Sequence, residues 1–385
     1  MASSTEPSKT NTWTTVDRNC QQTDVDVYHK DLIIMETQSK DEQRPIPKQG
    51  DTLRFGECFS DHMLDIEWSA DKGWSKPCIR PYENLSLDPA CKVFHYASEL
   101  FEGMKAYRGV DDRIRLFVPE LNMRRMRRTA IRATLPDFDG DELLKCIKEL
   151  VRLDQSWVPS EKGASLYIRP TLIGTDPRIG ISASSFAKLF VILAPVGSYF
   201  TTFSPIALLA NPQYTRAAKG GVGAFKMGCN YAPTLFVSEQ AVKKGCHQVT
   251  EAGAMNIFLH WKNKNGEDEL ITPSLESGLI LPGITRQSIL ELSREMGGLK
   301  VTERDFTMGE LKAAVNENRV HEFFASGTAV IVTPIEKVLY ITGEQEETLR
   351  FPAKDHDDSL SQRMLKALTD IYYGRVSRPG WTVEV

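Results

Sequence analysis

Residues 224–231 read AFKMGCNY, and this short stretch carries the main indication of both fold and chemistry. Lys226 lies between an aromatic and a thioether side chain, a glycine turn follows, and Tyr231 comes next. Burial among apolar neighbours lowers the pKa of a lysine, because the ammonium form loses its hydration. The neutral amine can then attack an aldehyde and form a Schiff base. Taken alone, such a stretch more often marks a surface lysine whose stem crosses apolar neighbours.

Two later stretches have features that suit an aromatic phosphate cofactor. In residues 250–256, TEAGAMN, Glu251 stands just before an apolar run. A carboxylate there would keep a pyridine nitrogen protonated, so that the ring withdraws electrons. In residues 281–288, LPGITRQS, a Pro-Gly turn leads into a helix. The amides near Ile284 and Thr285 would then be unpaired and able to bind a phosphate.

Two more stretches could complete a phosphate site. Residues 326–329, SGTA, place the hydroxyl of Thr328 at the mouth of an expected strand. Residues 122–132, NMRRMRRTAIR, are rich in arginine, and one guanidinium turned inward would suit a phosphate. Each stretch also has an ordinary explanation: a turn glutamate, a capped helix, a strand entry and a solvated helix face.

In their common order, these stretches make the chain resemble the eukaryotic branched-chain amino acid aminotransferases, which have pyridoxal-phosphate fold type IV. The resemblance runs from about residue 52 to residue 385. Nine stretches carry it, in chain order: FSDHMLDIEW, LFEGMKAYRG, NMRRM, ASLYIRPTLIGT, APVGSYF, KMGCNYAPTLF, TEAGAMNIFLHW, LPGITRQSILEL and SGTA.

The resemblance implies an α/β protein of two domains that binds pyridoxal 5'-phosphate. Lys226 would form the Schiff base and move the proton during catalysis. Arg125, rather than Arg124, would bind the phosphate. The implied cofactor-binding residues are Lys226, Arg125, Tyr231, Glu251, Ile284, Thr285 and Thr328.

The resemblance also implies the reaction: transfer of the amino group of leucine, isoleucine or valine to 2-oxoglutarate by a ping-pong mechanism. Aromatic walls suit a branched aliphatic side chain and reject polar ones. Arg169 with Tyr96 would receive the distal carboxylate of glutamate, and Tyr199 would lie in a loop that acts as a lid. The implied substrate-binding residues are Tyr96, Phe101, Tyr167, Arg169, Tyr199 and Ala329.

The chain departs from the family pattern before Glu251. Lys226 and Glu251 are 25 residues apart (251 − 226), whereas family members have about ten residues more, which form a hairpin. We therefore expect residues 245–256 to form one strand in place of two and to support Glu251 poorly. Ala254 replaces a threonine of vertebrate members, and no CxxC pair follows SGTA. Two alternatives stay open: a non-catalytic shortened form that binds cofactor weakly, and another type IV pyridoxal-phosphate enzyme.

Composition narrows the classes of partner. The net charge of −4 provides no general basic field for nucleic acid or an anionic membrane. No apolar run approaches the roughly 18 residues of a membrane span. The seven cysteines and seven histidines are scattered, without CxxC or HExxH, so no metal site is expected. The acidic, Arg-poor leader favours the cytoplasm, with mitochondria as the alternative. The resemblance implies a homodimer.

We expect a flexible extension at 1–50 with one short strand at 32–35, a small N-terminal domain at 51–195, an interdomain loop at 196–204 and a large C-terminal domain at 205–385. Hydrophobic periodicity and breaker residues predict the remaining elements. Strands are expected at 114–117, 188–193, 206–210, 256–261 and 327–332, and helices at 121–133, 141–153, 285–296 and 359–372.

Overall fold

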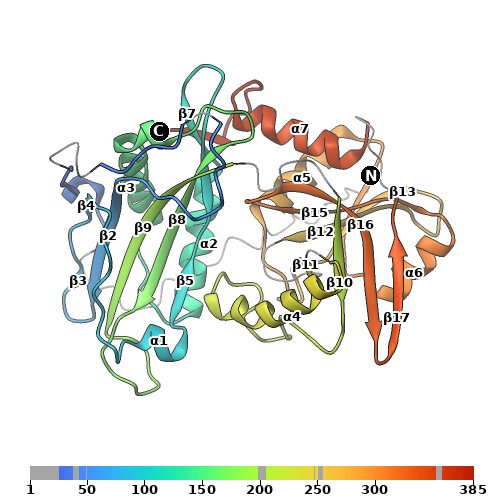
Figure 1. Ribbon diagram of the computed structural model, residues 1–385, viewed down its shortest axis with the longest axis horizontal. Helices are drawn as coiled ribbons and strands as arrows, with labels where there is room; N and C mark the ends of the chain where they lie inside the picture. Colours follow the sequence, from blue (N-terminus) through green and yellow to red (C-terminus); the bar gives the residue numbers. More distant parts are fainter. Residues whose placement is uncertain are drawn as a thin grey trace, which may run out of the picture.

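The computed structural model describes residues 26–37, 43–48, 50–197, 205–246, 248–249 (backbone only), 255–352 and 358–385. These residues form two β-sheets that occupy the two halves of the molecule, with helices packed on both (Figure 1). In this part of the chain, no helix combines the length and apolar character needed to cross a bilayer.

The first sheet has the strand order β1-β4-β2-β9-β8-β6-β7-β18, with β3 beside β2 and β5 beside β8. Its long central strands β8 and β9 pair antiparallel over their whole common length. The strands are β1 (Ile33–Ile34), β2 (His62–Ser69), β3 (Gly73–Trp74), β4 (Cys78–Pro81), β5 (Glu99–Phe101), β6 (Met104–Arg108), β7 (Ile114–Phe117), β8 (Ser165–Gly174), β9 (Phe186–Val196) and β18 (Thr382–Glu384).

Helices α2 (Pro119–Arg132) and α3 (Gly140–Leu153) pack on this first sheet. Pro119 occupies the first turn of α2, where a missing N–H costs nothing. Asp139 caps α3 by accepting hydrogen bonds from two backbone amides of the first turn. The apolar stripes of both helices are buried in the core as expected: Met123, Met126, Ala130, Leu144, Ile147 and Val151. The short helix α1 (Lys92–Tyr96) precedes β5.

The second sheet has the order β11-β10-β16-β15-β12-β13-β14, with β17 beside β16. Its strands are β10 (Ile206–Ala210), β11 (Gln248–Val249), β12 (Asn256–Lys262), β13 (Asp268–Thr272), β14 (Lys300–Glu303), β15 (Val320–Gly327), β16 (Ile331–Thr342) and β17 (Gln345–Arg350). Its helices are α4 (Ala232–Lys243), α5 (Ile284–Met296), α6 (Met308–Asn316) and α7 (Leu360–Tyr372). Helices α5 and α7 pack on the face that holds Phe258 and Phe324, and α6 packs on the other.

Most of the expected elements are confirmed. The strands at 114–117 and 206–210 have the expected bounds, and the other elements differ by a few residues at their ends. The strand expected at 327–332 is wrong. Gly327 pairs with Ile331 across a tight turn, so β15 ends and β16 begins within that stretch. Its β-branched composition indicated a strand, but Ile331 takes a φ of 62°, which closes the hairpin instead.

Two segments outside residues 51–195 also join the first sheet. Strand β1 pairs with β4, and β18, near the end of the chain, pairs with β7. Both edge strands of the first sheet, β1 and β18, therefore come from outside residues 51–195.

The expected single strand at 245–256 is also wrong. Strand β11 pairs parallel with β10, whereas β12 pairs with β13 and β15, so the two are separate strands at different places in the sheet. Strand β11 has two residues, and they pair with two of the five residues of β10. Residues 250–254, with Glu251 and Ala254, lie outside the described residues, as does Tyr199.

Candidate functional site

The loop between β10 and α4 holds Lys226 at the boundary between the two halves. The backbone N–H of Lys226 donates to Thr129 Oγ1 of α2 at 3.3 Å, and its carbonyl accepts from the N–H of Phe101 in β5 at 3.1 Å. The Asn230 amide donates to the carbonyls of Val222 and Phe225, both at 2.8 Å. The loop is therefore fastened both to itself and to the first sheet. Sequence reasoning missed Thr129 and Asn230.

The side chain of Lys226 lies among aromatic rings. Its Nζ donates to the hydroxyl of Tyr231 at 3.2 Å and lies 4.6 Å from the centroid of the Phe101 ring. Burial, with the nearby positive charge of Arg125, lowers the pKa of Lys226 to about 8. Burial also raises the pKa of the Tyr231 hydroxyl, which therefore stays protonated. The arrangement provides an amine that loses its proton far more easily than a surface lysine.

Arg125 and Glu102 form a buried ion pair beside this lysine. Arg125 is 3% exposed, and its Nε and Nη2 donate to the two carboxylate oxygens of Glu102 at 2.7 and 2.8 Å. Burial would raise the pKa of Glu102, but the Arg125 guanidinium outweighs it and lowers that pKa below its ordinary value. Arg125 Nη1 donates to the Pro282 carbonyl at 3.0 Å, so the guanidinium lies beside the start of α5.

Glu102 was missed by sequence reasoning, although a signal for it exists. It stands inside the apolar stretch LFEGM, and a glutamate that is buried with its neighbours must be paired. The Asn122 amide donates a further hydrogen bond to it at 2.8 Å. Both partners come from the arginine-rich helix α2, so that helix supplies the compensating groups.

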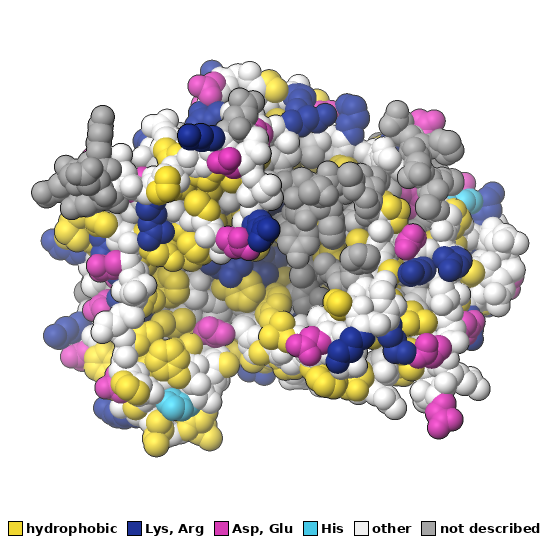
Figure 2. Space-filling model, viewed as in Figure 1, with side chains coloured by type: hydrophobic (Ala, Val, Ile, Leu, Met, Phe, Trp, Pro, Cys, Tyr) yellow, Lys and Arg dark blue, Asp and Glu magenta, His cyan; other side chains and the backbone are white. Residues whose placement is uncertain are grey.

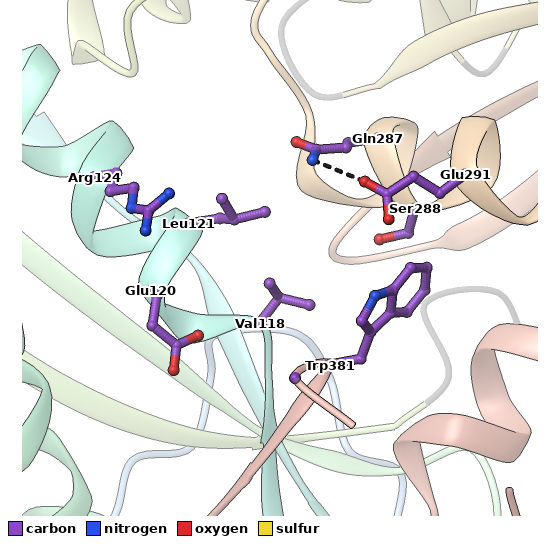
Figure 3. A pocket seen from close by; sticks show the side chains of 9 residues that line it. Val118, Glu120, Leu121, Arg124, Gln287, Ser288, Glu291 and Trp381 are labelled. Atoms are coloured by element: carbon purple, nitrogen blue, oxygen red, sulfur yellow. Dashed lines mark hydrogen bonds between the residues drawn. The ribbon is translucent and has the colours of Figure 1, made fainter. Parts of the chain in front are cut away.

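Arg124 faces another way. It is exposed and lines a cavity of about 340 Å³ between α2, α5 and the chain end near Trp381 (Figure 3). Gln287 and Glu291 of α5, joined by a hydrogen bond of 2.9 Å, line the same cavity. Successive helical residues point about 100° apart, so Arg124 and Arg125 cannot share one ligand. The geometry agrees with the expected choice of Arg125, whose role in binding phosphate stays a prediction.

Three of the expected phosphate-binding residues line one small cavity. Ile284 and Thr285 in the first turn of α5, and Thr328 in the turn between β15 and β16, line a space of about 20 Å³. Gly283 precedes this helix without a side-chain cap, so the first amides of α5 remain available to an anion. A Cβ on Gly283 would lie 2.1 Å from Asn256 Oδ1, so only glycine allows this close approach.

Lys105 lies at the same cavity and was not singled out from the sequence. It is 5% exposed, and its Nζ donates to the carbonyl of Ala329 at 3.0 Å. Burial lowers its pKa to about 8. The lysine therefore holds the 328–330 turn in place and adds positive charge beside Thr328.

Three of the expected substrate-binding residues meet beside Lys226. Arg169 donates to the Tyr167 hydroxyl at 2.9 Å, and its guanidinium lies 4.6 Å from the centroid of Phe101. A Cβ on Gly103 would lie 2.1 Å from the Tyr167 hydroxyl, so this glycine leaves room for the ring. Together these side chains make an aromatic wall with one cationic group.

Tyr96 does not join this wall within the described chain. It is 42% exposed at the end of α1, its hydroxyl donates to the Ile179 carbonyl, and its ring lies beside His95. Tyr199 and Glu251 lie outside the described residues. The roles expected for these three residues stay predictions.

Known proteins resemble this chain over most of its length. Residues 99–338 match the family described as amino-transferase class IV. The cytosolic branched-chain-amino-acid aminotransferase of Caenorhabditis elegans is 50% identical, over 93% of this chain and 89% of that protein. The cytosolic enzyme of Rattus norvegicus is 52% identical, over 92% and 87%. The mitochondrial enzyme of the same species is 49% identical, over 89% and 88%.

Solved structures share the fold at lower identity. A branched-chain aminotransferase from Thermoproteus uzoniensis, solved with norvaline, has a TM-score of 0.64 at 22% identity, covering 83% of this chain and 99% of that one. The enzyme of Thermobaculum terrenum in its PLP-bound form has a TM-score of 0.64 at 21% identity, covering 85% and 98%. The two-sheet arrangement is thus that of fold type IV, as expected.

Proposed function

The chain belongs to the branched-chain-amino-acid aminotransferases of class IV, and on that premise we propose which of its residues bind the cofactor and carry the reaction. It is a pyridoxal-phosphate-dependent transaminase that transfers the amino group of leucine, isoleucine or valine to 2-oxoglutarate by a ping-pong mechanism. This assignment disfavours both the non-catalytic alternative and another type IV activity.

The described residues fit pyridoxal phosphate. The first turn of α5 has no side-chain cap, the buried Arg125 is bonded to the Pro282 carbonyl beside it, and Arg125 lies close enough to Lys226 to help lower the pKa of that lysine. We assign the phosphate to Arg125, to the amides of Ile284 and Thr285, and to the hydroxyl of Thr328. Lys226 would hold the cofactor covalently, and the Tyr231 hydroxyl, 3.2 Å from Nζ, would contact the ring oxygen. Glu251 would meet the ring nitrogen.

When bound, pyridoxal phosphate supplies the carbonyl that takes up the amino group and the ring that withdraws electrons from the substrate Cα. Lys226 then moves the proton at Cα. Its lowered pKa suits this work, because a general base performs best when its pKa lies near the working pH. The Tyr231 hydroxyl orients Nζ between transfers, and the Glu102–Arg125 pair keeps the arginine fixed.

Substrate selection follows from the wall beside Lys226. Phe101 and Tyr167 offer apolar surface to a branched aliphatic side chain. Arg169 is the cationic group placed to receive the second carboxylate of glutamate or 2-oxoglutarate. We propose that Tyr96, Tyr199 and Ala329 complete the pocket. One pocket thereby takes an apolar and an acidic substrate in turn.

A homodimer is the assembly that best explains the exposed apolar side chains near α1. Phe94, Ile179 and Ile181 are 60%, 66% and 88% exposed, around the exposed Tyr96. Figure 2 shows hydrophobic side chains gathered in this lower-left part of the surface. Pairing of such patches between two copies would bury them. Light scattering after size exclusion should give twice the chain mass. The names of the cytosolic relatives support the cytosol as the compartment.

The lowered pKa of Lys226 within the aromatic cluster is the observation that carries the site assignment. The test is borohydride reduction of the holoenzyme followed by peptide mapping, which should label Lys226; a label on another lysine would contradict it. A visible spectrum recorded with and without leucine tests the reaction, with D-alanine as the comparison. Only leucine should shift the spectrum.

A further inference from the structure

Three potential metal ligands gather on the second sheet, away from the residues assigned to transamination. His260 of β12, Asp268 of β13 and His321 of β15 each offer one ligand atom, and these atoms all lie within 4.8 Å of one another. His321 Nε2 lies 3.0 Å from Asp268 Oδ1, and the rings of His260 and His321 have centroids 4.9 Å apart. Three neighbouring strands therefore converge on one point.

An irregularity in the strand pairing creates this cluster. His260 pairs with Glu322, but the next residue, Trp261, pairs with Val320, so His321 is an extra residue in β15. Such a bulge redirects a side chain relative to the regular alternation of a strand. It places the His321 ring beside that of His260, while Val320 remains in the apolar core with Trp261.

Part of the cluster lacks the hydrogen bonding that a purely structural role would provide. His260 Nδ1 is buried and has no hydrogen-bond partner in the described structure. The Glu322 carboxylate lies 3.8 Å from it, but both of its oxygens already accept bonds from the backbone amides of Leu360 and Ser361, at 2.6 and 3.0 Å. An ion on the other ring nitrogen would account for this arrangement, because a metal-bound histidine typically turns its second ring N–H toward a carboxylate, here that of Glu322.

We propose that His260, Asp268 and His321 bind one divalent transition-metal ion, with Zn²⁺ the best match, and water as the fourth ligand. Two imidazoles and one carboxylate are a ligand set that zinc takes, whereas Mg²⁺ and Ca²⁺ prefer oxygen alone. His260 Nδ1 faces Glu322, so Nε2 is the nitrogen assigned to the metal, and the carboxylate orients the ring from behind. Asp268 is 47% exposed, which leaves solvent access for the ion.

The ion would act on the fold and not in transamination. It would join β12, β13 and β15 across the sheet. Strand β12 begins at Asn256, whose amide holds the Leu281 carbonyl before α5 at 3.0 Å, and β15 runs into the turn that bears Thr328. A metal clamp on these strands would therefore stiffen two supports of the cofactor site.

Isothermal titration of untagged, chelator-treated holoenzyme with ZnCl₂ tests the proposal. We expect one Zn²⁺ per chain, a raised melting temperature, and no binding of MgCl₂. His321→Ala should lower the affinity at least about tenfold. The matched control His95→Ala removes a histidine that bonds the Pro89 carbonyl elsewhere, and it should leave binding unchanged.

A second variant and a spectroscopic readout keep the test decisive. Asp268→Asn retains shape and should also weaken binding, even if His321→Ala proves unstable. Co²⁺ bound in place of Zn²⁺ should give the weak visible absorption bands that are typical of nitrogen and oxygen ligands. Absence of zinc binding, binding that survives both variants, or a thiolate charge-transfer band from one of the cysteines would overturn the assignment.

Discussion

The two sheets meet at the cofactor site but contribute to it in different ways. The first sheet and its helix α2 offer side chains that packing and pairing hold in place: Tyr167 inside β8, Phe101 at the end of β5, and Arg125 inside α2, which is paired with Glu102. The second sheet offers the ends of its elements: the loop with Lys226, the first turn of α5, and the turn with Thr328. The first half thus provides a framework of packed and paired side chains, whereas the second half presents groups at the ends of its helices and strands.

This difference shows how the site divides two tasks between the halves: carrying the chemistry and shaping the substrate pocket. Backbone amides without helical partners occur where a helix begins, and loops carry reactive side chains such as that of Lys226, so the chemistry is found at the ends of elements. Walls of defined shape need side chains that packing holds still, so they come from strands. We therefore expect changes at the element ends to remove activity with little loss of stability, and changes within the framework to affect both.

The largest effect should come from Lys226→Ala. Without the amine, the cofactor is not held covalently and no base moves the Cα proton, so leucine transamination should fall below detection. The melting temperature should change little, because Lys226 lies in a loop held by its backbone. The control Lys243→Ala, at an exposed site, should retain full activity. If Lys226→Ala kept activity comparable with that of the control, Lys226 would not be the residue that carries the reaction.

Glu102→Gln should cause the largest loss of stability. It leaves the buried Arg125 charge without its partner, and breaking a buried ion pair on one side costs about 3–5 kcal/mol. Urea unfolding measures this loss. Glu276→Gln, at an exposed position, serves as the control and should cost almost nothing. Equal stabilities for the two variants would show that the Glu102–Arg125 ion pair does not stabilise the fold.

Arg125→Ala should weaken cofactor binding about 10- to 100-fold, since a hydrogen bond to a charged group is worth about 1.5–3 kcal/mol. Arg124→Ala is the matched control, one residue away on the exposed side of α2, and should leave the affinity nearly unchanged. Fluorescence titration of the cofactor-free protein provides the measurement. Equal effects from both substitutions would contradict the assignment of the phosphate to Arg125.

A smaller effect should follow from adding to the edge of the second sheet. An insertion of about ten residues between Val249 and Thr250, enough for a two-stranded hairpin, would extend the two-residue strand β11. We expect a higher melting temperature, because more of the fully buried strand β10 would then be paired. We also expect better cofactor retention, since Glu251 follows the insertion. Identical values in both proteins would mean that the shorter segment is harmless.

The smallest effect concerns pH. Only the neutral form of Lys226 attacks the cofactor, and its pKa lies at about 8 instead of 10.5. The rate of cofactor uptake by the cofactor-free protein should therefore rise with pH and level off above about 8. Stopped-flow absorbance measures this rate. A rise that continues to pH 10 would show that the lysine is not buried as described.

Local patterns allowed most elements to be predicted. The strand Ile114–Phe117 and the helices over Arg125 and Leu144 follow from hydrophobic periodicity, which depends on neighbours in sequence. The turn at Thr328 was misread, because its β-branched residues favour a strand while the hairpin geometry of Gly327 and Ile331 overrides them. The strand pairing of β11 was also misjudged, since pairing depends on distant partners.

The sequence by itself determined the family, the candidate lysine and the helices and strands around it, because motif order and periodicity are properties of neighbouring residues. Only the tertiary structure decided which groups meet. It paired Glu102 with Arg125, turned Arg124 outward, and brought His260 to His321 through a bulge. Such contacts join residues far apart in the chain, and burial, charge pairing and strand register select them only once the whole fold has formed.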